Sequence, residues 1–293
     1  MNLRDLEYFY QLSQLKSYTE VAHHFKVSQP TVSYAVKRLE EDLECDLIVK
    51  DPSHRRVELT LQGDIFASNV EEILLQVQTA INDVHQSLQP TITVGFPPII
   101  SNYLFKKLLH QNQELSPLYQ VKTVRGGSKS LMMKLLSGQL DLSLLGSLQP
   151  LRNDQLIIHP LFQKAFYFVL SKNHPLAHKK ELSFKELLQE NFILLDEHNI
   201  HLTAFSQLNH RYKDQANILL KIDDVSVIKQ MVAENMGISL LSDIALTSDS
   251  DQLVKIPLIE EESIIFYVSY AYSRHARLNK IAQDLIQVIE CVS

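Results

Sequence analysis

The 293-residue sequence predicts an α/β protein in three parts: a small N-terminal domain of three helices and a β-hairpin, one long linker helix, and a larger domain of two α/β lobes. Three observations predict this division. Short amphipathic stretches with capping residues fill the first 60 positions. A heptad pattern follows to residue 89. From residue 90 onward, short apolar strands alternate with helical stretches. We therefore expect boundaries at 1–60, 61–89 and 90–293.

The composition excludes several classes of protein. Hydrophobic residues make up 45% of the chain, yet no apolar run approaches the ~20 residues of a membrane span, and the first residues lack the pattern of a signal peptide. Two cysteines, Cys45 and Cys291, are too few for a disulfide framework or, by themselves, a zinc site. We expect a cytoplasmic protein with no cofactor, no metal and no membrane association.

The first 44 residues predict three helices. Apolar residues at helical spacing indicate a helix over 2–16. Ser17 and Glu20 form a capping-box pattern, which opens a short second helix. Ser28 is a candidate N-cap for a third helix over 29–44, with Pro30 in its first turn, where the missing N–H is no loss. Two β-leaning stretches, 46–50 and 56–60, follow and are joined by a turn. Three helices and a hairpin describe a winged helix-turn-helix.

The exposed face of the third helix suits DNA. An α-helix fits the major groove, where Gln29 can pair with adenine and Ser33 can bond either class of base. Pro30 and Thr31 can contact a thymine methyl. The basic side chains nearby suit phosphates, although residues 1–90 carry 8 Lys/Arg and 14 Asp/Glu. For each residue taken alone, the alternative is an ordinary solvated surface position. The DNA-contact candidates are Ser28, Gln29, Pro30, Thr31, Ser33, Tyr34, Lys37, Arg38, Lys50, Arg55 and Arg56.

The long helix predicted over 61–89 carries apolar residues at alternating steps of four and three, which is a coiled-coil seam. We expect this seam to form a dimer, and the alternative is that it packs on its own domain. Gln89-Pro90 ends the helix. The seam residues are Val70, Leu74, Val77, Ile81, Val84 and Leu88.

From residue 91 the alternation predicts mostly parallel sheets in two lobes, with chain crossings near Lys164 and 266–270. The predicted strands are 91–96, 119–124, 140–145, 165–170, 192–195, 218–222, 238–241 and 264–270. Helices are predicted at 101–113, 128–139, 184–190, 203–212, 225–235 and 274–290.

Several motifs together resemble one family. Within the N-terminal part these are Leu6-Glu7-Tyr8-Phe9, Val27-Ser28-Gln29-Pro30-Thr31-Val32-Ser33, Lys37-Arg38-Leu39-Glu40 and Arg56-Val57-Glu58-Leu59-Thr60; the later landmarks are Gly138-Gln139-Leu140-Asp141-Leu142 and Glu234-Asn235-Met236-Gly237-Ile238. The pattern is similar to that of LysR-type transcriptional regulators over essentially the whole chain. Two regions depart from it: the wing reads Leu47-Ile48-Val49-Lys50 where Leu-Phe and an arginine are usual, and in the third helix Tyr34 stands where arginine is frequent.

The resemblance implies a DNA reader, a dimerising linker helix and a C-terminal domain like a periplasmic binding protein. Its implied partners are double-stranded promoter DNA, RNA polymerase, a small-molecule co-inducer and further copies of the chain, as a homodimer or homotetramer. Within the family the chain resembles regulators of malolactic fermentation in lactic acid bacteria. That similarity makes a small carboxylate such as L-malate the expected effector.

Candidate effector contacts lie where strands end and helices begin, because free backbone N–H groups and the helix dipole attract anions there. The family places polar ligand contacts at two such turns, which here hold Ser101 and Ser128. His201 and Thr203 would face them from the second lobe. The alternative for each is ordinary turn chemistry. His198 and His201 without a third ligand are more typical of a protein surface than of a metal site.

Other classes of function fit less well. Ser13-x-x-Lys16 matches a penicillin-recognising motif, but no companion motif is present, and no phosphate loop, His-Glu-x-x-His or Gly-x-Ser-x-Gly occurs. A plain solute-binding protein would lack the DNA reader. A thiol switch would need a cysteine pair in the effector domain, where only Cys291 lies. We therefore expect a regulator and not an enzyme.

Overall fold

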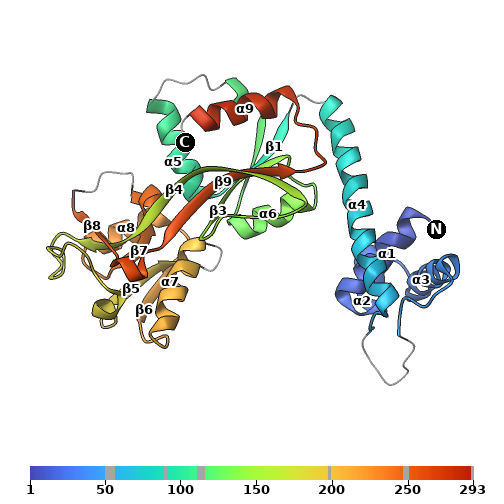
Figure 1. Ribbon diagram of the computed structural model, residues 1–293, viewed down its shortest axis with the longest axis horizontal. Helices are drawn as coiled ribbons and strands as arrows, with labels where there is room; N and C mark the ends of the chain where they lie inside the picture. The colour runs from blue at the N-terminus through green and yellow to red at the C-terminus, as the bar shows by residue number, and fades with distance from the viewer. Residues whose placement is uncertain (50–56, 89–90, 111–115, 197–198, 247–250, 292–293) are drawn as a thin grey trace. The chain divides into compact units, whose positions relative to one another are not determined.

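The computed structural model describes residues 1–49, 57–88, 91–110, 116–196, 199–246 and 251–291 (Figure 1). They form two compact units, 1–84 and 85–293, and each unit has a hydrophobic core of its own. The predicted fold class is confirmed: a helix-turn-helix unit and a long helix precede a two-lobed α/β domain.

The first unit contains α1 (Leu3–Leu15), α2 (Tyr18–Phe25) and α3 (Gln29–Leu43). The predicted caps are present, because the Ser17 side chain accepts the Glu20 N–H at 3.3 Å and the Ser28 side chain accepts the Thr31 N–H at 3.4 Å. These caps fix the turn between α2 and α3. The apolar faces of the three helices meet in a core that includes Leu6, Phe9, Leu12, Val21, Val32, Val36 and Leu39.

The base of the wing is attached to α3 and to the long helix α4 (Leu61–Leu88). Ile48 and Leu59 form an antiparallel bridge. The Glu40 carboxylate on α3 accepts the backbone N–H groups of Leu47 and Ile48 at 2.8 and 3.2 Å. A Cβ atom at Gly63 would lie 2.1 Å from the Leu47 carbonyl oxygen, so α4 can begin this close to the wing only with glycine there.

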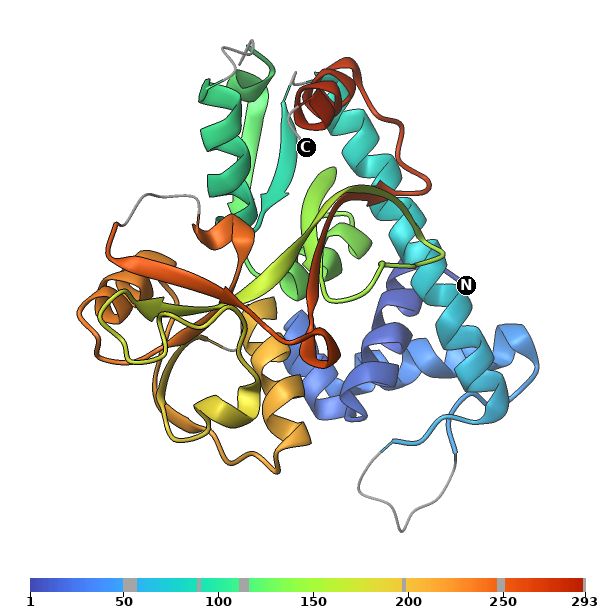
Figure 2. The same ribbon diagram turned by 60° about the vertical axis from the view of Figure 1, so that its left-hand side comes forward.

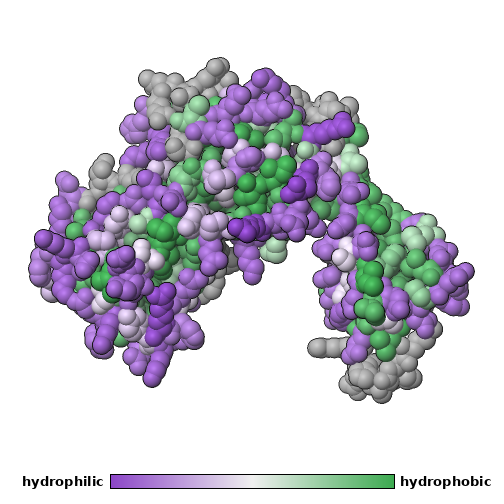
Figure 3. Space-filling view, in the orientation of Figure 1, coloured by the Kyte–Doolittle hydropathy of each residue, from purple (hydrophilic) through white to green (hydrophobic). Residues whose placement is uncertain are grey.

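The first part of the predicted seam on α4 packs on its own unit, which is the alternative that the sequence left open for these residues. Val70 is fully buried in the core of its own unit, and Leu74 packs against that core. The Tyr10 hydroxyl donates to Glu71 at 2.7 Å and ties α4 to α1. Beyond this point Ile81 is 44% exposed and Val84 is 59% exposed. The side chain of a further seam residue, Leu88, lies outside what the structure describes. Figure 3 shows hydrophobic atoms along α4.

The first lobe of the second unit is built on β1 (Ile92–Phe96), β2 (Val121–Arg125) and β3 (Leu142–Ser147), with β1 parallel to both neighbours. Two helices connect these strands, α5 (Pro98–His110) after β1 and α6 (Ser128–Leu136) after β2. A 3₁₀ turn, η1 (Ser116–Gln120), precedes β2, and α9 (Lys280–Cys291) completes the lobe. This strand-helix order brings the starts of α5 and α6 to the carboxyl edge of the sheet.

Two long strands join the lobes: β4 (Leu156–Ser171) and β9 (Ile265–Ser273) run antiparallel and side by side (Figures 1 and 2). The strand order is β2-β1-β3-β9-β4-β7, with β8 also paired to β4. In β4, residues 156–165 pair with β9, whereas 166–171 pair with the strands of the second lobe. The prediction of mostly parallel sheets is therefore wrong for the described strands, because every pairing of β4 and β9 is antiparallel.

The second lobe contains β5 (Asn191–Leu195) parallel to β6 (Asn217–Ile222), together with β7 (Ser239–Ser242) and β8 (Leu253–Pro257). Its helices are α7 (Ile200–Arg211) and α8 (Val225–Ala233), and the 3₁₀ turns are η2 (Phe184–Leu187), η3 (Asp243–Leu246) and η4 (Glu260–Glu262). Stacked and edge-on contacts among Phe184, Phe192 and Phe205 fill its core. Within the described part of the chain, no helix combines the length and apolar character that crossing a bilayer requires.

Candidate DNA interface and effector site

The outer face of α3 presents the predicted DNA contacts to solvent. Ser28, Gln29, Pro30, Thr31, Ser33, Tyr34, Lys37 and Arg38 are all exposed. The opposite face, with Val32, Val36 and Leu39, is buried in the core. This division follows from the helical period and leaves the polar face free to enter a groove. Tyr34 is 65% exposed, so its ring stands out from the middle of that face.

The predicted phosphate contacts fall into three groups. Lys37 is exposed and lies 3.5 Å from Glu41, a surface pair that holds it weakly. Arg38 instead points toward α1 and forms an ion pair with Asp5, and this hydrogen-bonded carboxylate raises the pKa of Arg38. The other predicted contacts, Lys50, Arg55 and Arg56, lie outside the described residues.

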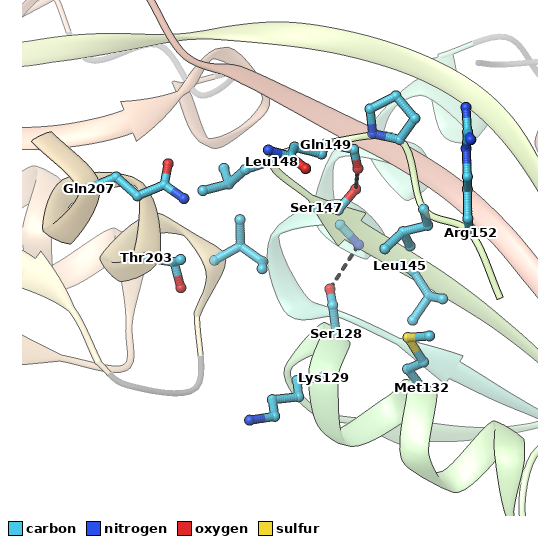
Figure 4. A pocket seen from close by; sticks show the side chains of 14 residues that line it. Ser128, Lys129, Met132, Leu145, Ser147, Leu148, Gln149, Arg152, Thr203 and Gln207 are labelled. Carbon is cyan, nitrogen blue, oxygen red and sulfur yellow. Dashed lines mark hydrogen bonds between the residues drawn. The ribbon is translucent and has the colours of Figure 1, made fainter. Parts of the chain in front are cut away.

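A cavity of about 480 Å³ opens in the second unit where α6 and the end of β3 face α7 (Figure 4). Ser128, the first residue of α6, is buried, and its Oγ accepts the Gly146 N–H at 2.8 Å. Gly127 caps α6 without a side-chain hydrogen bond, so the N-terminal amides of the helix stay available to a ligand. Thr203 and Gln207 reach the cavity from α7.

The charge of this cavity favours an anion. Lys129 and Arg152 lie at its edge, on α6 and on the loop after β3, and no carboxylate is found among the described residues that line it. The positive end of the α6 dipole points the same way. Apolar side chains complete the wall: Met132, Leu145, Leu148, Leu151 and Ile200. The cavity can therefore hold a small acid by its charged end and pack its carbon skeleton.

A second cavity, of about 510 Å³, has the opposite character. Arg125 on the first-lobe side faces Asp196, Asp223 and Asp224 on the second-lobe side. Asp224 caps α8 by accepting the Ser226 N–H at 2.7 Å. The excess of carboxylates repels an anion, so of the two cavities the one at Ser128 suits a carboxylate effector.

The structure brings together two of the four predicted effector residues, Ser128 and Thr203, at this cavity, and the other two do not line it. Ser101 is buried on α5, and its hydroxyl donates to the Pro98 carbonyl oxygen at 3.0 Å. His201 is 3% exposed, and its Nε2 lies 2.8 Å from the Ser242 Oγ. Both side chains turn into the protein because their own helices carry them to the buried face.

Sequence reasoning missed Arg152 and Gln207 as lining residues. Arg152 follows the end of β3, so the same strand-end rule that selected Ser128 could have found it. Gln207 lies four residues after Thr203, one helical turn along the same face of α7. Among the described residues, no group of three or more His, Cys, Asp or Glu side chains is placed so that it could hold a metal ion.

Comparison with known proteins gives the same division of the chain. Residues 3–64 match the bacterial regulatory helix-turn-helix protein of the lysR family, and residues 85–292 match the LysR substrate binding domain. The chain is 48% identical over 290 residues to a malolactic fermentation system transcriptional activator of Lactococcus lactis subsp. lactis (strain IL1403), covering 99% of this chain and 98% of the relative.

More distant proteins share the architecture. The hydrogen peroxide-inducible genes activator of Haemophilus influenzae is 25% identical over 85% of this chain and 82% of its own. A full-length OxyR variant from Pseudomonas aeruginosa superimposes with a TM-score of 0.56 at 24% identity, covering 100% of this chain and 99% of that one. Full-length BenM gives a TM-score of 0.54 at 20% identity, covering 100% and 96%.

A winged helix-turn-helix followed by a ligand-binding α/β domain defines a DNA-binding transcription regulator with an effector domain. The chain belongs to the LysR family of transcriptional regulators. Members of this family and the curated relatives are regulators and not enzymes.

Proposed function

We propose that this regulator controls genes of malolactic fermentation and responds to a small carboxylate such as L-malate. The observation that carries the proposal is the cationic cavity at Ser128, whose lining combines two basic side chains, a free helix N-terminus and apolar walls. The 48% identity to a malolactic fermentation activator over nearly the full length of both chains supports the same reading.

In this proposal the ligand bridges the two lobes. Its carboxylate is held by the amides at the start of α6 and by Lys129 or Arg152, while Thr203 and Gln207 on α7 bind a hydroxyl or a second carboxylate. Because the contacts come from both lobes, the ligand stabilises the arrangement in which they lie closest. The ligand can shift the balance between a closed and an open arrangement of the lobes only by as much free energy as it binds the closed one more tightly.

DNA recognition is assigned to α3 and the wing. Gln29, Ser33, Pro30 and Thr31 contact base edges in the major groove, and the basic residues of the wing and Lys37 contact phosphates. We place the protein in the cytoplasm, where it meets promoter DNA and RNA polymerase. A change in its contacts to the DNA, to the polymerase or to both would transmit the effector signal.

Two apolar surfaces support assembly with further copies. The exposed residues Ile73, Ile81 and Val84 on α4 form a stripe that a second α4 can cover, giving a dimer with two DNA readers. Strand β6 has a second exposed surface with Ile218, Leu219 and Leu220. Burial of both surfaces would convert dimers into a tetramer.

Calorimetry with L-malate tests the effector site. Ser128→Ala should weaken L-malate binding by about 0.5–3 kcal/mol, because a hydrogen bond to a charged group is lost. The matched control is Ser101→Ala, which removes a buried hydroxyl of the same lobe that points away from the cavity and should leave the affinity unchanged. Equal affinity in wild type and Ser128→Ala would contradict the assigned cavity. Binding of lactate as tight as that of L-malate would contradict the two-ended recognition.

A further inference from the structure

Arg38 lies among the exposed residues of α3, but its guanidinium group contacts α1. The Nη2 atom donates to Asp5 Oδ1 at 2.5 Å, and Nε donates to Asp5 Oδ2 at 3.2 Å. These two parallel bonds form a fork, which fixes both the distance and the orientation of the two planar groups. The Arg38 side chain is 53% exposed to solvent, while the Asp5 side chain is only 2% exposed.

The Asp5 carboxylate needs this partner. It is buried in the first turn of α1, where its backbone N–H donates to Asn2 Oδ1 at 2.9 Å. A buried charge without compensation is strongly destabilising, and removal of one partner of such a pair exposes that cost. The shorter, flexible Lys side chain offers a point charge and cannot reproduce the fork. The pair therefore sets where α3 lies along α1.

We propose that Arg38 is a positioning residue of the DNA reader: its fork with Asp5 holds α3 at the angle and depth at which Gln29 and Ser33 reach base edges. In this role its charge is compensated within the protein and not by a DNA phosphate. The inference rests on the assignment of α3 as the DNA-reading helix. The neighbouring Lys37 differs, because its exposed partner Glu41 is 3.5 Å away and leaves it available to a phosphate.

The variant Asp5→Asn distinguishes a positioning role of Arg38 from a phosphate contact, because the two predict opposite changes in DNA affinity. The probe is a duplex selected in vitro from a random library with the wild-type protein, and a scrambled duplex serves as the non-specific reference. A positioning role predicts weaker binding to the selected duplex, by about tenfold, and a smaller preference over the scrambled duplex. A phosphate-contacting Arg38 would be released by this substitution, and both duplexes would bind more tightly.

Substitutions at Arg38 give a second, independent measurement. Arg38→Lys keeps the charge but loses the fork, so we expect it to lose specific affinity as Arg38→Gln does. The double variant Asp5→Asn/Arg38→Gln removes both charges and leaves two groups that can hydrogen-bond. It should recover most of the specific affinity lost in Arg38→Gln, because no buried charge is left unpaired. Melting temperatures of all variants show which of them fold.

The salt dependence of binding completes the test. Arg38→Gln should leave the slope of log K against log salt unchanged, whereas the control Lys37→Gln should lower its magnitude by about 1 for both duplexes. Tighter binding by Asp5→Asn, wild-type affinity in Arg38→Lys, or a reduced slope in Arg38→Gln would overturn the positioning role. Gln29→Ala with full sequence preference would instead refute α3 as the reader, so the two failures are distinguishable.

Discussion

The buried side chain of His201 has a pKa that is set by its surroundings. Its ring contacts Phe166 and Phe266, with centroid distances of 5.1 and 5.5 Å, and its Nε2 is hydrogen-bonded to Ser242. Burial lowers the pKa of His201 from 6.5 to about 3. The imidazole is therefore neutral in the folded domain under ordinary conditions and ties α7 to β7.

This neutral histidine makes stability depend on pH. The unfolded chain binds a proton at His201 below about pH 6.5, and the folded chain does not until about pH 3. Above pH 6.5, His201 therefore does not lower the free energy of unfolding. As the pH drops from 6.5 toward 3, this free energy falls by up to about 1.4 kcal/mol per pH unit, because the unfolded chain gains a proton that the folded chain does not. NMR titration of the imidazole should show no protonation between pH 7.5 and 5. A titration midpoint near 6.5 would refute the burial effect, and His201→Gln should unfold with a flatter pH profile than wild type.

The residues of α3 that we propose to contact bases should respond to substitution differently from ordinary surface residues. We expect Gln29→Ala and Ser33→Ala each to weaken binding to the selected duplex by about 1–3 kcal/mol while binding to a scrambled duplex stays nearly intact. Gel-shift titrations with both duplexes measure this ratio. Gln14→Ala, an exposed glutamine on α1, is the control. Loss of affinity for both duplexes to the same extent would contradict base reading.

Residue types alone predicted part of the lining of the cavity at Ser128. Ser128 and Thr203 could be selected because they stand near helix starts at strand ends, where ligands bind in α/β folds. The partner of Arg38 could not, because Asp5 is 33 residues away and only the packing of α1 on α3 brings the two together. For the same reason nothing in the sequence showed that Ser101 and His201 face inward.

At the scale of elements, the helix α4 changes its role along its length. Its first half completes the core of the DNA-reading unit through Val70, and its second half exposes Ile81 and Val84. A periodic apolar stripe predicts only that something covers it. Whether the cover comes from the same chain depends on where the domain ends, and periodicity carries no information about that.

The two halves of α4 should respond differently to an introduced charge. Ile81→Asp places a carboxylate in the proposed dimer surface and should dissociate the dimer while the monomer remains folded. Val70→Asp buries the same group in the core and should unfold the DNA-reading unit, at a cost of about 3 kcal/mol or more. Sedimentation and circular dichroism distinguish the outcomes. Gln76→Asp, on an exposed position of the same helix, is the control. An unchanged dimer in Ile81→Asp would contradict the surface.

Most strands and helices were predicted within a few residues, and the exceptions have physical causes. The first half of β4 was missed because Pro160, which cannot donate to a ladder, interrupts its pattern at a register shift between Pro160 and Phe162. Strand β8 was not predicted, because it is only five residues long and ends at Pro257, which weakens a strand pattern. Strand direction was misjudged because alternating elements favour parallel pairing, whereas β4 and β9 cross between lobes and return antiparallel.

At the scale of the whole molecule, the outer strand β6 offers a surface for association with another chain. Residues 217–221 are all exposed, although Ile218, Leu219 and Leu220 are apolar. An apolar outer strand invites pairing with another chain, and soluble proteins usually protect such strands with charge or cover. This surface therefore supports association of the effector domains.

Leu219→Lys should block that association without affecting the α4 surface. We expect the variant to sediment as a dimer at concentrations where wild type forms tetramers, and to bind a single half-site pair with unchanged affinity. Thr123→Lys, an exposed position on another outer strand, controls for added charge. A wild-type protein that is dimeric throughout, or a tetramer that survives Leu219→Lys, would contradict the role of β6.

Gly146 connects the effector cavity with the strands that cross between the lobes. Its N–H donates to Ser128 Oγ in the cavity, and a Cβ atom at this position would lie 2.5 Å from the ring of Phe266 on β9. When the Ser128 hydroxyl donates its own proton to a bound anion, its oxygen becomes a better acceptor for that N–H. Amide hydrogen exchange at Gly146 should then slow as the cavity fills, so one backbone proton at the crossing reports the occupancy of the effector site.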